Sequence, residues 1–119
     1  MGTPTTLIAH GTTLSAFARR LHDEFGAVHV YLFGSHATGR AAPDSDYDLI
    51  IVSAAFEEIP RLARHFGMHD LFYELGGNAP LDLVCLTPDE FESAKKRITL
   101  VSAVMPEAID LLAEESAPA

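Results

Sequence analysis

The sequence predicts a small α/β or α+β domain, in which short buried strands alternate with amphipathic helices. Three observations support this class. Segments with helical periodicity alternate with short segments rich in β-branched residues, and turn residues separate them. The chain has 119 residues, which is within the range of one compact domain. Its hydrophobic fraction of 48% provides for one core, so we expect a single domain over residues 1–119.

The first half of the chain predicts one helix and two strands. Residues 13–25 place apolar side chains at helical spacing, with a threonine, Thr12 or Thr13, as the N-cap and Gly26 as the residue that stops the helix. Residues 27–33 form a short run rich in strand-forming residues, and residues 47–54 form another. Both runs have the length and composition of a strand.

A second helical stretch and a third strand follow. Residues 60–77 have helical periodicity but are interrupted near Gly67. Residues 80–87 predict a strand that contains Cys85, the only cysteine. We interpret Cys85 as a small core residue, because a free cysteine in an apolar run is usually buried. A single cysteine excludes an intrachain disulfide and is typical of a reducing compartment.

Capping residues mark the start of the next helix. Thr87 is the expected N-cap, Pro88 takes the first helical position, and Glu90 stands three residues after the cap. A last helix is expected over residues 100–115, with Pro106 kinking it or starting a second segment. The predicted order is therefore helix, strand, strand, helix, strand and further helices.

Charge and hydropathy exclude several classes of protein. The chain has 17 acidic and 8 basic residues, which gives a net charge of −9. It shows no broad cluster of Lys and Arg to bind a nucleic-acid backbone, and an anionic membrane surface is disfavoured for the same reason. No apolar stretch reaches the ~20 residues of a membrane span, and no signal peptide is recognisable. We therefore expect a cytoplasmic protein that binds neither membranes nor nucleic acid.

Two aspartates stand one residue apart where the second predicted strand begins. In a strand, Asp46 and Asp48 would project from one face and Tyr47 from the other. Asp is a poor strand former, and an unpaired buried carboxylate is costly, so the pair needs compensation. Two like charges this close would drive one carboxyl to protonate unless a cation lay between them. Oxygen-only ligation suits Mg²⁺, which also binds substrate phosphates.

Further residues complete a candidate site. Asp82 lies near the start of the third predicted strand and would complete a cluster of three carboxylates if that strand lay beside the second. Such a cluster resembles a two-metal phosphoryl-transfer site. Gly34 and Ser35 follow the first strand, where backbone N–H groups and the serine hydroxyl can contact a phosphate. A lone D-x-D motif is usually a pair of solvent-exposed aspartates, so the combination of the motif with Gly34-Ser35 and Asp82 is what indicates the site. His36 either contacts a phosphate or is a turn residue with no functional contact.

The segment GSHATGRAAPDSDYD contains Gly34-Ser35, then ten residues, then Asp46-Tyr47-Asp48. It resembles the G-S-x10-D-x-D signature of minimal nucleotidyltransferases, the small members of the DNA polymerase beta-like superfamily. The resemblance is strong over residues 31–52 and good over residues 81–92.

This resemblance implies the nucleotidyltransferase fold, a mixed sheet flanked by helices. It implies that Asp46, Asp48 and Asp82 are ligands of two Mg²⁺ ions, with Asp82 also the base that activates an attacking hydroxyl. Gly34 and Ser35 match the pair that holds the nucleotide triphosphate. The implied reaction transfers a nucleoside monophosphate, commonly AMP from ATP, to an acceptor hydroxyl and releases pyrophosphate.

The resemblance also implies a partner. Minimal nucleotidyltransferases are often encoded beside a helical HEPN protein, and some act as antitoxins that attach AMP to a tyrosine of that partner. An acidic chain fits a basic partner better than it fits DNA. Two alternatives stay open: a non-catalytic antitoxin that acts by binding alone, and an enzyme that modifies a small molecule such as an aminoglycoside. The high apolar fraction also leaves a homo-oligomer open.

Overall fold

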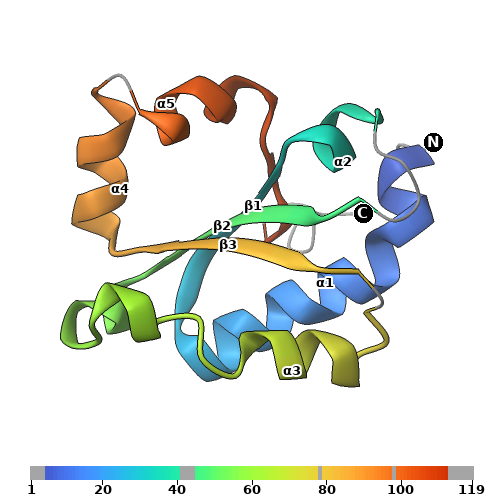
Figure 1. The fold of residues 1–119 in the computed structure, drawn as a ribbon, viewed down its shortest axis with the longest axis horizontal. Helices are drawn as coiled ribbons and strands as arrows, with labels where there is room; N and C mark the ends of the chain where they lie inside the picture. The colour runs from blue at the N-terminus through green and yellow to red at the C-terminus, as the bar shows by residue number, and fades with distance from the viewer. Residues whose placement is uncertain (1–4, 41–44, 78, 98, 113–119) are drawn as a thin grey trace.

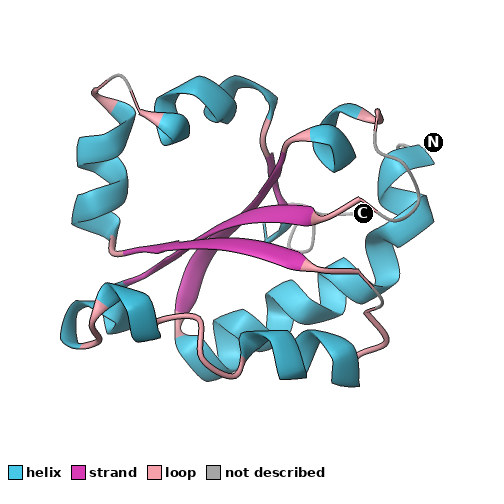
Figure 2. Cartoon of the chain, in the orientation of Figure 1, coloured by secondary structure: helices cyan, strands magenta, loops and turns pink. Residues whose placement is uncertain are grey.

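The structure, a computed structural model, describes residues 5–40, 45–77, 79–97 and 99–112. Helices and strands alternate along the chain (Figure 1), and Figure 2 shows the strands together at the centre with helices around them. The strands are β1 (Ala27–Phe33), β2 (Tyr47–Ser53), β3 (Leu81–Leu86) and β4 (Ile109–Asp110). The α-helices are α1 (Thr5–Phe25), α2 (Ser35–Thr38), α3 (Met68–Glu74), α4 (Pro88–Lys95) and α5 (Leu100–Val104). The 3₁₀ helices are η1 (Ala54–Glu58), η2 (Arg61–Ala63) and η3 (Met105–Glu107).

The strands form one mixed sheet in the order β3-β2-β1-β4. β1 is antiparallel to both β2 and β4, whereas β2 and β3 are parallel. The chain reaches β3 from β2 through η1, η2 and α3, because parallel neighbours need a crossover connection. The predicted fold, a small mixed sheet flanked by helices, is confirmed.

Helices cover both faces of the sheet, and the alternation of side chains along the strands divides the core in two. On one face, Leu49 and Ile51 of β2 belong to a buried cluster with residues of α1 and α3. On the other face, Ile50 and Val52 belong to a second cluster with residues of α4 and α5. In Figure 1, α1 and α3 lie below the sheet and α4 and α5 lie above it. Asp48 continues the face of Ile50, so it lies on the side of α4 and α5.

The first helix is longer than the sequence predicts. α1 begins at Thr5 and runs through Thr12 and Thr13, so neither threonine is its N-cap. Threonine is only modestly unfavourable inside a helix, and this preference is weak enough for the longer helix to form. The predicted stop at Gly26 is confirmed, since this residue has a positive φ of 72° and its N–H donates to the carbonyl of His22 at 3.2 Å.

The stretch over residues 60–77 is only partly α-helical. Gly67 interrupts it as predicted, with a φ of 86°, and α3 begins at the next residue. Before Gly67, however, η2 forms a short 3₁₀ turn instead of an α-helix. This half of the stretch exposes Leu62 (87%) and Phe66 (68%), so it lacks the packing that sustains a short α-helix.

The predicted α-helix over residues 100–115 is wrong over residues 105–110, whereas Leu111 and Leu112 are again helical. α5 gives way to η3 at Met105, next to Pro106, and the chain then extends as β4. Ile109 pairs with Leu32 of β1, and the strand continues through the next residue. The free edge of β1 offers backbone partners that the local helical pattern does not reveal, so tertiary pairing overrides periodicity here. Residues 113–115 of this predicted helix lie outside the described residues.

A buried arginine joins the crossover segment to β3 and α4. Arg64 is 6% exposed, and its guanidinium donates to the carbonyls of Ile59 at 3.0 Å and Cys85 at 3.1 Å. The same group pairs with both oxygens of Glu90, at 2.7 and 3.3 Å. Glu90 in turn accepts from the N–H of Thr87 at 2.9 Å, and this contact is part of the capping box that the sequence predicts for α4.

Cys85, predicted as a core residue, is partly buried and lies at the margin of the core. Its side chain packs against the cluster that α1 and α3 cover, and burial raises the pKa of the thiol to about 11. The thiol therefore stays protonated at neutral pH. Within the described part of the chain, we find no helix whose length and apolar character would let it cross a bilayer.

Candidate active site

The parallel pairing of β2 with β3 brings two of the predicted carboxylates together. Asp48 is the direct partner of Asp82 in the register of the two strands. Paired positions of neighbouring strands point to the same face, so both side chains lie on the face that α4 and α5 cover. The two carboxyls are close enough for Asp82 to raise the pKa of Asp48. The third predicted strand thus lies beside the second, as the proposed cluster requires.

Asp46 lies just outside the strand. β2 begins at Tyr47, whose N–H donates to the carbonyl of Pro80 at 3.0 Å, and Asp46 is the exposed residue before it. The prediction that Asp46 and Asp48 share one strand is therefore wrong for Asp46. A strand begins where backbone partners begin, and an aspartate adds no strand preference of its own. The Asp46 carboxylate is still close enough to raise the pKa of Asp48.

Asp48 is the electrostatic centre of this region. Burial raises the pKa of its carboxyl, and the neighbouring charges of Asp82 and Asp46 raise it further. His36 acts in the opposite direction and lowers the pKa, but its effect is smaller than that of burial. A half-buried carboxyl between two other carboxylates is stabilised by either a proton or a cation.

Gly34 lies against this aspartate. β1 ends at Phe33, which pairs with Asp48 in the antiparallel register. Gly34 then takes φ 76° and ψ −155°, a conformation essentially restricted to glycine. A Cβ added at Gly34 would lie 2.5 Å from Oδ2 of Asp48, which is closer than real Cβ contacts. Ser35 follows as the first residue of α2, so the Gly-Ser pair lies beside the carboxylates.

His36 has a structural role that the sequence does not reveal. Its side chain is buried, and Nε2 donates to the carbonyl of Ser45 at 3.0 Å. Its ring stacks on Tyr47 with 4.0 Å between the ring centroids. These contacts attach α2 to the segment that carries Asp46 and so bring the two halves of the motif together. The interpretation of His36 as a turn residue without contacts is therefore wrong. Its burial could not be inferred from its position in a turn-rich segment.

The donor set fits a hard divalent cation. Asp46, Asp48 and Asp82 offer only carboxylate oxygens, and their mutual repulsion is relieved when a cation binds. Over the described ranges, however, the structure contains no group of three or more His, Cys, Asp or Glu side chains placed to hold a metal ion. The strand pairing thus brings together two of the three carboxylates, those of Asp48 and Asp82. Asp46 lies beside them, just before β2 begins.

The chain matches the nucleotidyltransferase domain family over residues 14–111. It belongs to that family. The matched range includes the glycine-serine pair, all three aspartates and the four strands up to Asp110. The predicted family is confirmed, and with it the class of the protein as a transferase enzyme.

A curated relative of this nucleotidyltransferase is the protein adenylyltransferase MntA of Thermococcus cleftensis. The two are 34% identical over 64 residues, which are 54% of this chain and 62% of the relative. The matched stretch thus spans less than two thirds of the relative's length.

A solved structure with the same fold comes from Sulfolobus solfataricus, a protein provisionally described as a nucleotidyltransferase. The match covers 92% of this chain and 89% of the other, with a TM-score of 0.54 and 21% sequence identity. At this identity the likeness shows the fold alone, and the predicted nucleotidyltransferase fold is confirmed.

Proposed function

We propose that the protein transfers AMP from ATP to a hydroxyl of a partner protein in a reaction that depends on Mg²⁺. The observation that carries this proposal is the direct pairing of Asp48 with Asp82 beside the glycine-serine turn. Membership in the nucleotidyltransferase family supplies the reaction class. The relative from Thermococcus cleftensis is named as a protein adenylyltransferase, which supports a protein as the acceptor.

Each residue of the site has a proposed role in this reaction. Gly34 lets the backbone approach the triphosphate closely, and the hydroxyl of Ser35 donates a hydrogen bond to it. Asp82 accepts the proton of the acceptor hydroxyl, whose oxygen then attacks the α-phosphorus of ATP. A new O–P bond forms, the bond from the α-phosphorus to the bridging oxygen breaks, and pyrophosphate leaves with that oxygen.

Asp46, Asp48 and Asp82 would hold two Mg²⁺ ions. When bound, the ions neutralise the triphosphate and the charge that develops on the leaving pyrophosphate. The raised pKa of Asp48 supports this assignment, because a carboxyl repelled by two neighbours gains most from a nearby cation. The rigid strand pairing holds Asp48 and Asp82 at one spacing, which limits the reorganisation needed for binding.

The proposed acceptor is a tyrosine of a HEPN-type helical protein, and the modification would make this protein an antitoxin. The minimal nucleotidyltransferase signature, Gly34-Ser35 to Asp48, supports this role. The net charge of −9 favours a basic partner surface over a nucleic acid.

Label transfer tests the proposal. The full chain is incubated with Mg²⁺, a lysate of its host and ATP labelled at either the α- or the γ-phosphate. We expect label in a protein band from the α position alone, because nucleotidyl transfer retains only that phosphate. The double variant Asp46→Asn/Asp48→Asn should lose the label, whereas Asp23→Asn/Asp70→Asn, with the same charge change at exposed positions, should keep it.

Two results would contradict the proposal. Label from the γ position would indicate a kinase. Absence of label from both positions, even after addition of the protein encoded by the neighbouring gene, would favour an antitoxin that acts by binding alone. Mass spectrometry of the labelled band would identify the modified residue and so test the tyrosine assignment separately.

A further inference from the structure

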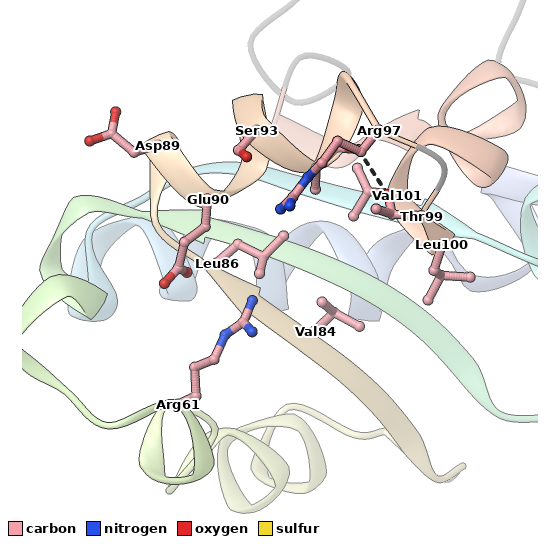
Figure 3. A pocket seen from close by; sticks show the side chains of 11 residues that line it. Arg61, Val84, Leu86, Asp89, Glu90, Ser93, Arg97, Thr99, Leu100 and Val101 are labelled. Atoms are coloured by element: carbon pink, nitrogen blue, oxygen red, sulfur yellow. Dashed lines mark hydrogen bonds between the residues drawn. The ribbon is translucent and has the colours of Figure 1, made fainter.

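A pocket of about 540 Å³ lies between β3, η2, α4 and α5 (Figure 3). This volume is within the range of sites that hold small molecules. Val84 and Leu86 of β3 contribute apolar side chains to it, as does Leu100. Val84 follows Asp82 by two residues on the same face of β3, so the pocket begins about 7 Å along the strand from that aspartate. None of the three candidate aspartates lines it.

Two arginines extend into this pocket from different elements. Arg61 comes from η2 and Arg97 from the residues that follow α4, and Figure 3 shows both guanidinium groups directed into the space between them. Among the residues that the structure describes, neither arginine forms an ion pair. Both side chains are therefore free to bind an anion.

The acidic residues of the pocket offset only part of this charge, because the effect of Arg61 on Glu90 is the smallest of those that shift the pKa of Glu90. Glu90 is already held by Arg64, which is buried behind it and contacts both carboxylate oxygens. Asp89 is exposed, and Figure 3 shows its carboxylate directed away from the two arginines. The pocket is thus a local positive site in a chain whose net charge is −9.

We propose that this pocket binds a phosphate monoester with an apolar body. The phosphate lies between Arg61 and Arg97, and the apolar body lies on Val84 and Leu86. A phosphate monoester carries a charge of about −1.5 to −2 at pH 7, which matches two guanidinium groups better than the single charge of a carboxylate. Guanidinium groups also bind phosphate oxygens in a bidentate manner. The proposal does not rest on nucleotidyl transfer, since the pocket shares no residue with the candidate active site.

The remaining lining residues support the same ligand class. Ser93 lies on the pocket side of α4 in Figure 3 and offers a hydroxyl donor beside the two arginines. The apolar floor favours an organic phosphate over inorganic phosphate, because contact with Val84 and Leu86 removes apolar ligand surface from water.

Titration of the full chain with phenyl phosphate tests the proposal. Amide chemical shifts are followed by NMR without divalent cations, so that the carboxylates of the candidate active site repel the probe. We expect saturable shifts at residues 84–86 and 93–101. The Arg97→Gln variant should weaken binding by about tenfold or more, because it removes a charge-assisted contact. Lys96→Gln, the same charge change at an exposed neighbour outside the pocket, should leave the affinity within about twofold.

Two further probes define the ligand class. Benzoate, with a similar ring and one negative charge, should bind more weakly than phenyl phosphate, and inorganic phosphate should bind more weakly for lack of an apolar body. Equal binding of benzoate would overturn the phosphate assignment. Equal losses in the Arg97 and Lys96 variants, or shifts centred on residues 34–36 and 46–48, would overturn the pocket itself as the site. These results are independent of label transfer, so each proposal can fail alone.

Discussion

Asp48 and Asp82 are direct partners on the parallel strands β2 and β3, and the carboxyl of Asp82 raises the pKa of Asp48. Neighbouring strands lie about 5 Å apart, so the backbone itself holds the two carboxylates together. The arrangement destabilises the folded state in the absence of a cation, because the two carboxylates repel each other when both are ionised. A substitution at either aspartate should therefore affect stability, metal binding and activity at the same time.

The Asp48→Asn variant should be more stable than the natural protein at pH 7 when no metal is present. The pKa of Asp48 is raised in the folded state, chiefly by burial. A raised pKa means that the folded state binds more protons, so stability falls as the pH rises from the ordinary value of 3.8 through the folded-state pKa. Asparagine does not ionise, so this decrease in stability should be absent from the variant. Urea unfolding from pH 3.5 to 7 checks it, with Asp70→Asn as an exposed control; a less stable Asp48→Asn protein at pH 7 would contradict the expectation.

Mg²⁺ should stabilise the natural protein and not the Asp48→Asn variant. A ligand present at a hundred times its dissociation constant contributes about 2.7 kcal/mol to the folded state. Thermal unfolding with increasing MgCl₂ measures this as a rise in Tm, and KCl of equal ionic strength controls for screening. An equal rise in both proteins would place the metal elsewhere. The same variant should lose at least about 10²-fold in label transfer if Asp48 holds the metal.

Gly34→Ala should cost both stability and activity. The added Cβ would meet Oδ2 of Asp48 at 2.5 Å, and the backbone conformation is one that alanine rarely adopts. We expect a loss of roughly 1–3 kcal/mol in the free energy of unfolding, together with most of the label transfer.

Gly67→Ala is the matched control for this substitution. Gly67 also has a positive φ, of 86°, but an added Cβ would meet nothing within 4 Å. It should cost roughly 1 kcal/mol from backbone strain alone and leave transfer intact. Equal loss of activity in both variants would show that the contact with Asp48 has no special role.

The Glu90→Gln variant should show a smaller fall in the free energy of unfolding as the pH decreases. The hydrogen bond from Arg64 lowers the pKa of Glu90, and the N–H of Thr87 lowers it further, against an opposing effect of burial. A lowered pKa adds stability that is present above the ordinary value of 4.5 and is lost as the pH falls through the folded-state pKa. Unfolding measured between pH 5 and pH 3 should therefore change less in Glu90→Gln than in the exposed control Asp89→Asn. Identical slopes would contradict the role of this ion pair.

Local features predicted several elements correctly. The capping box of Thr87 and Glu90 marked the start of α4, because its hydrogen bonds join residues only three apart. Gly67 marked the interruption before α3, since its positive φ is a property of glycine itself. The motif from Gly34 to Asp48 predicted the family for a related reason, as its spacing can be read along a single segment.

Long-range features could not be predicted in this way. The segment of Ile109 has a helical pattern, yet it forms β4 because the edge of β1 offers backbone partners. Arg64 reads as an ordinary surface residue of an amphipathic stretch, yet it is buried between Cys85 and Glu90. The start of β2 at Tyr47, which leaves Asp46 outside the strand, depends on the carbonyl of Pro80 as a partner.

The sequence by itself determined which residues carry the chemistry and where most helices and strands lie, because periodicity, caps and glycine conformations depend on near neighbours in the chain. Only the tertiary structure decided that β3 pairs in parallel with β2, and hence that Asp82 lies beside Asp48. The physical reason is that strand order and register follow from burying whole faces of the sheet under helices, and no local pattern specifies which faces will meet.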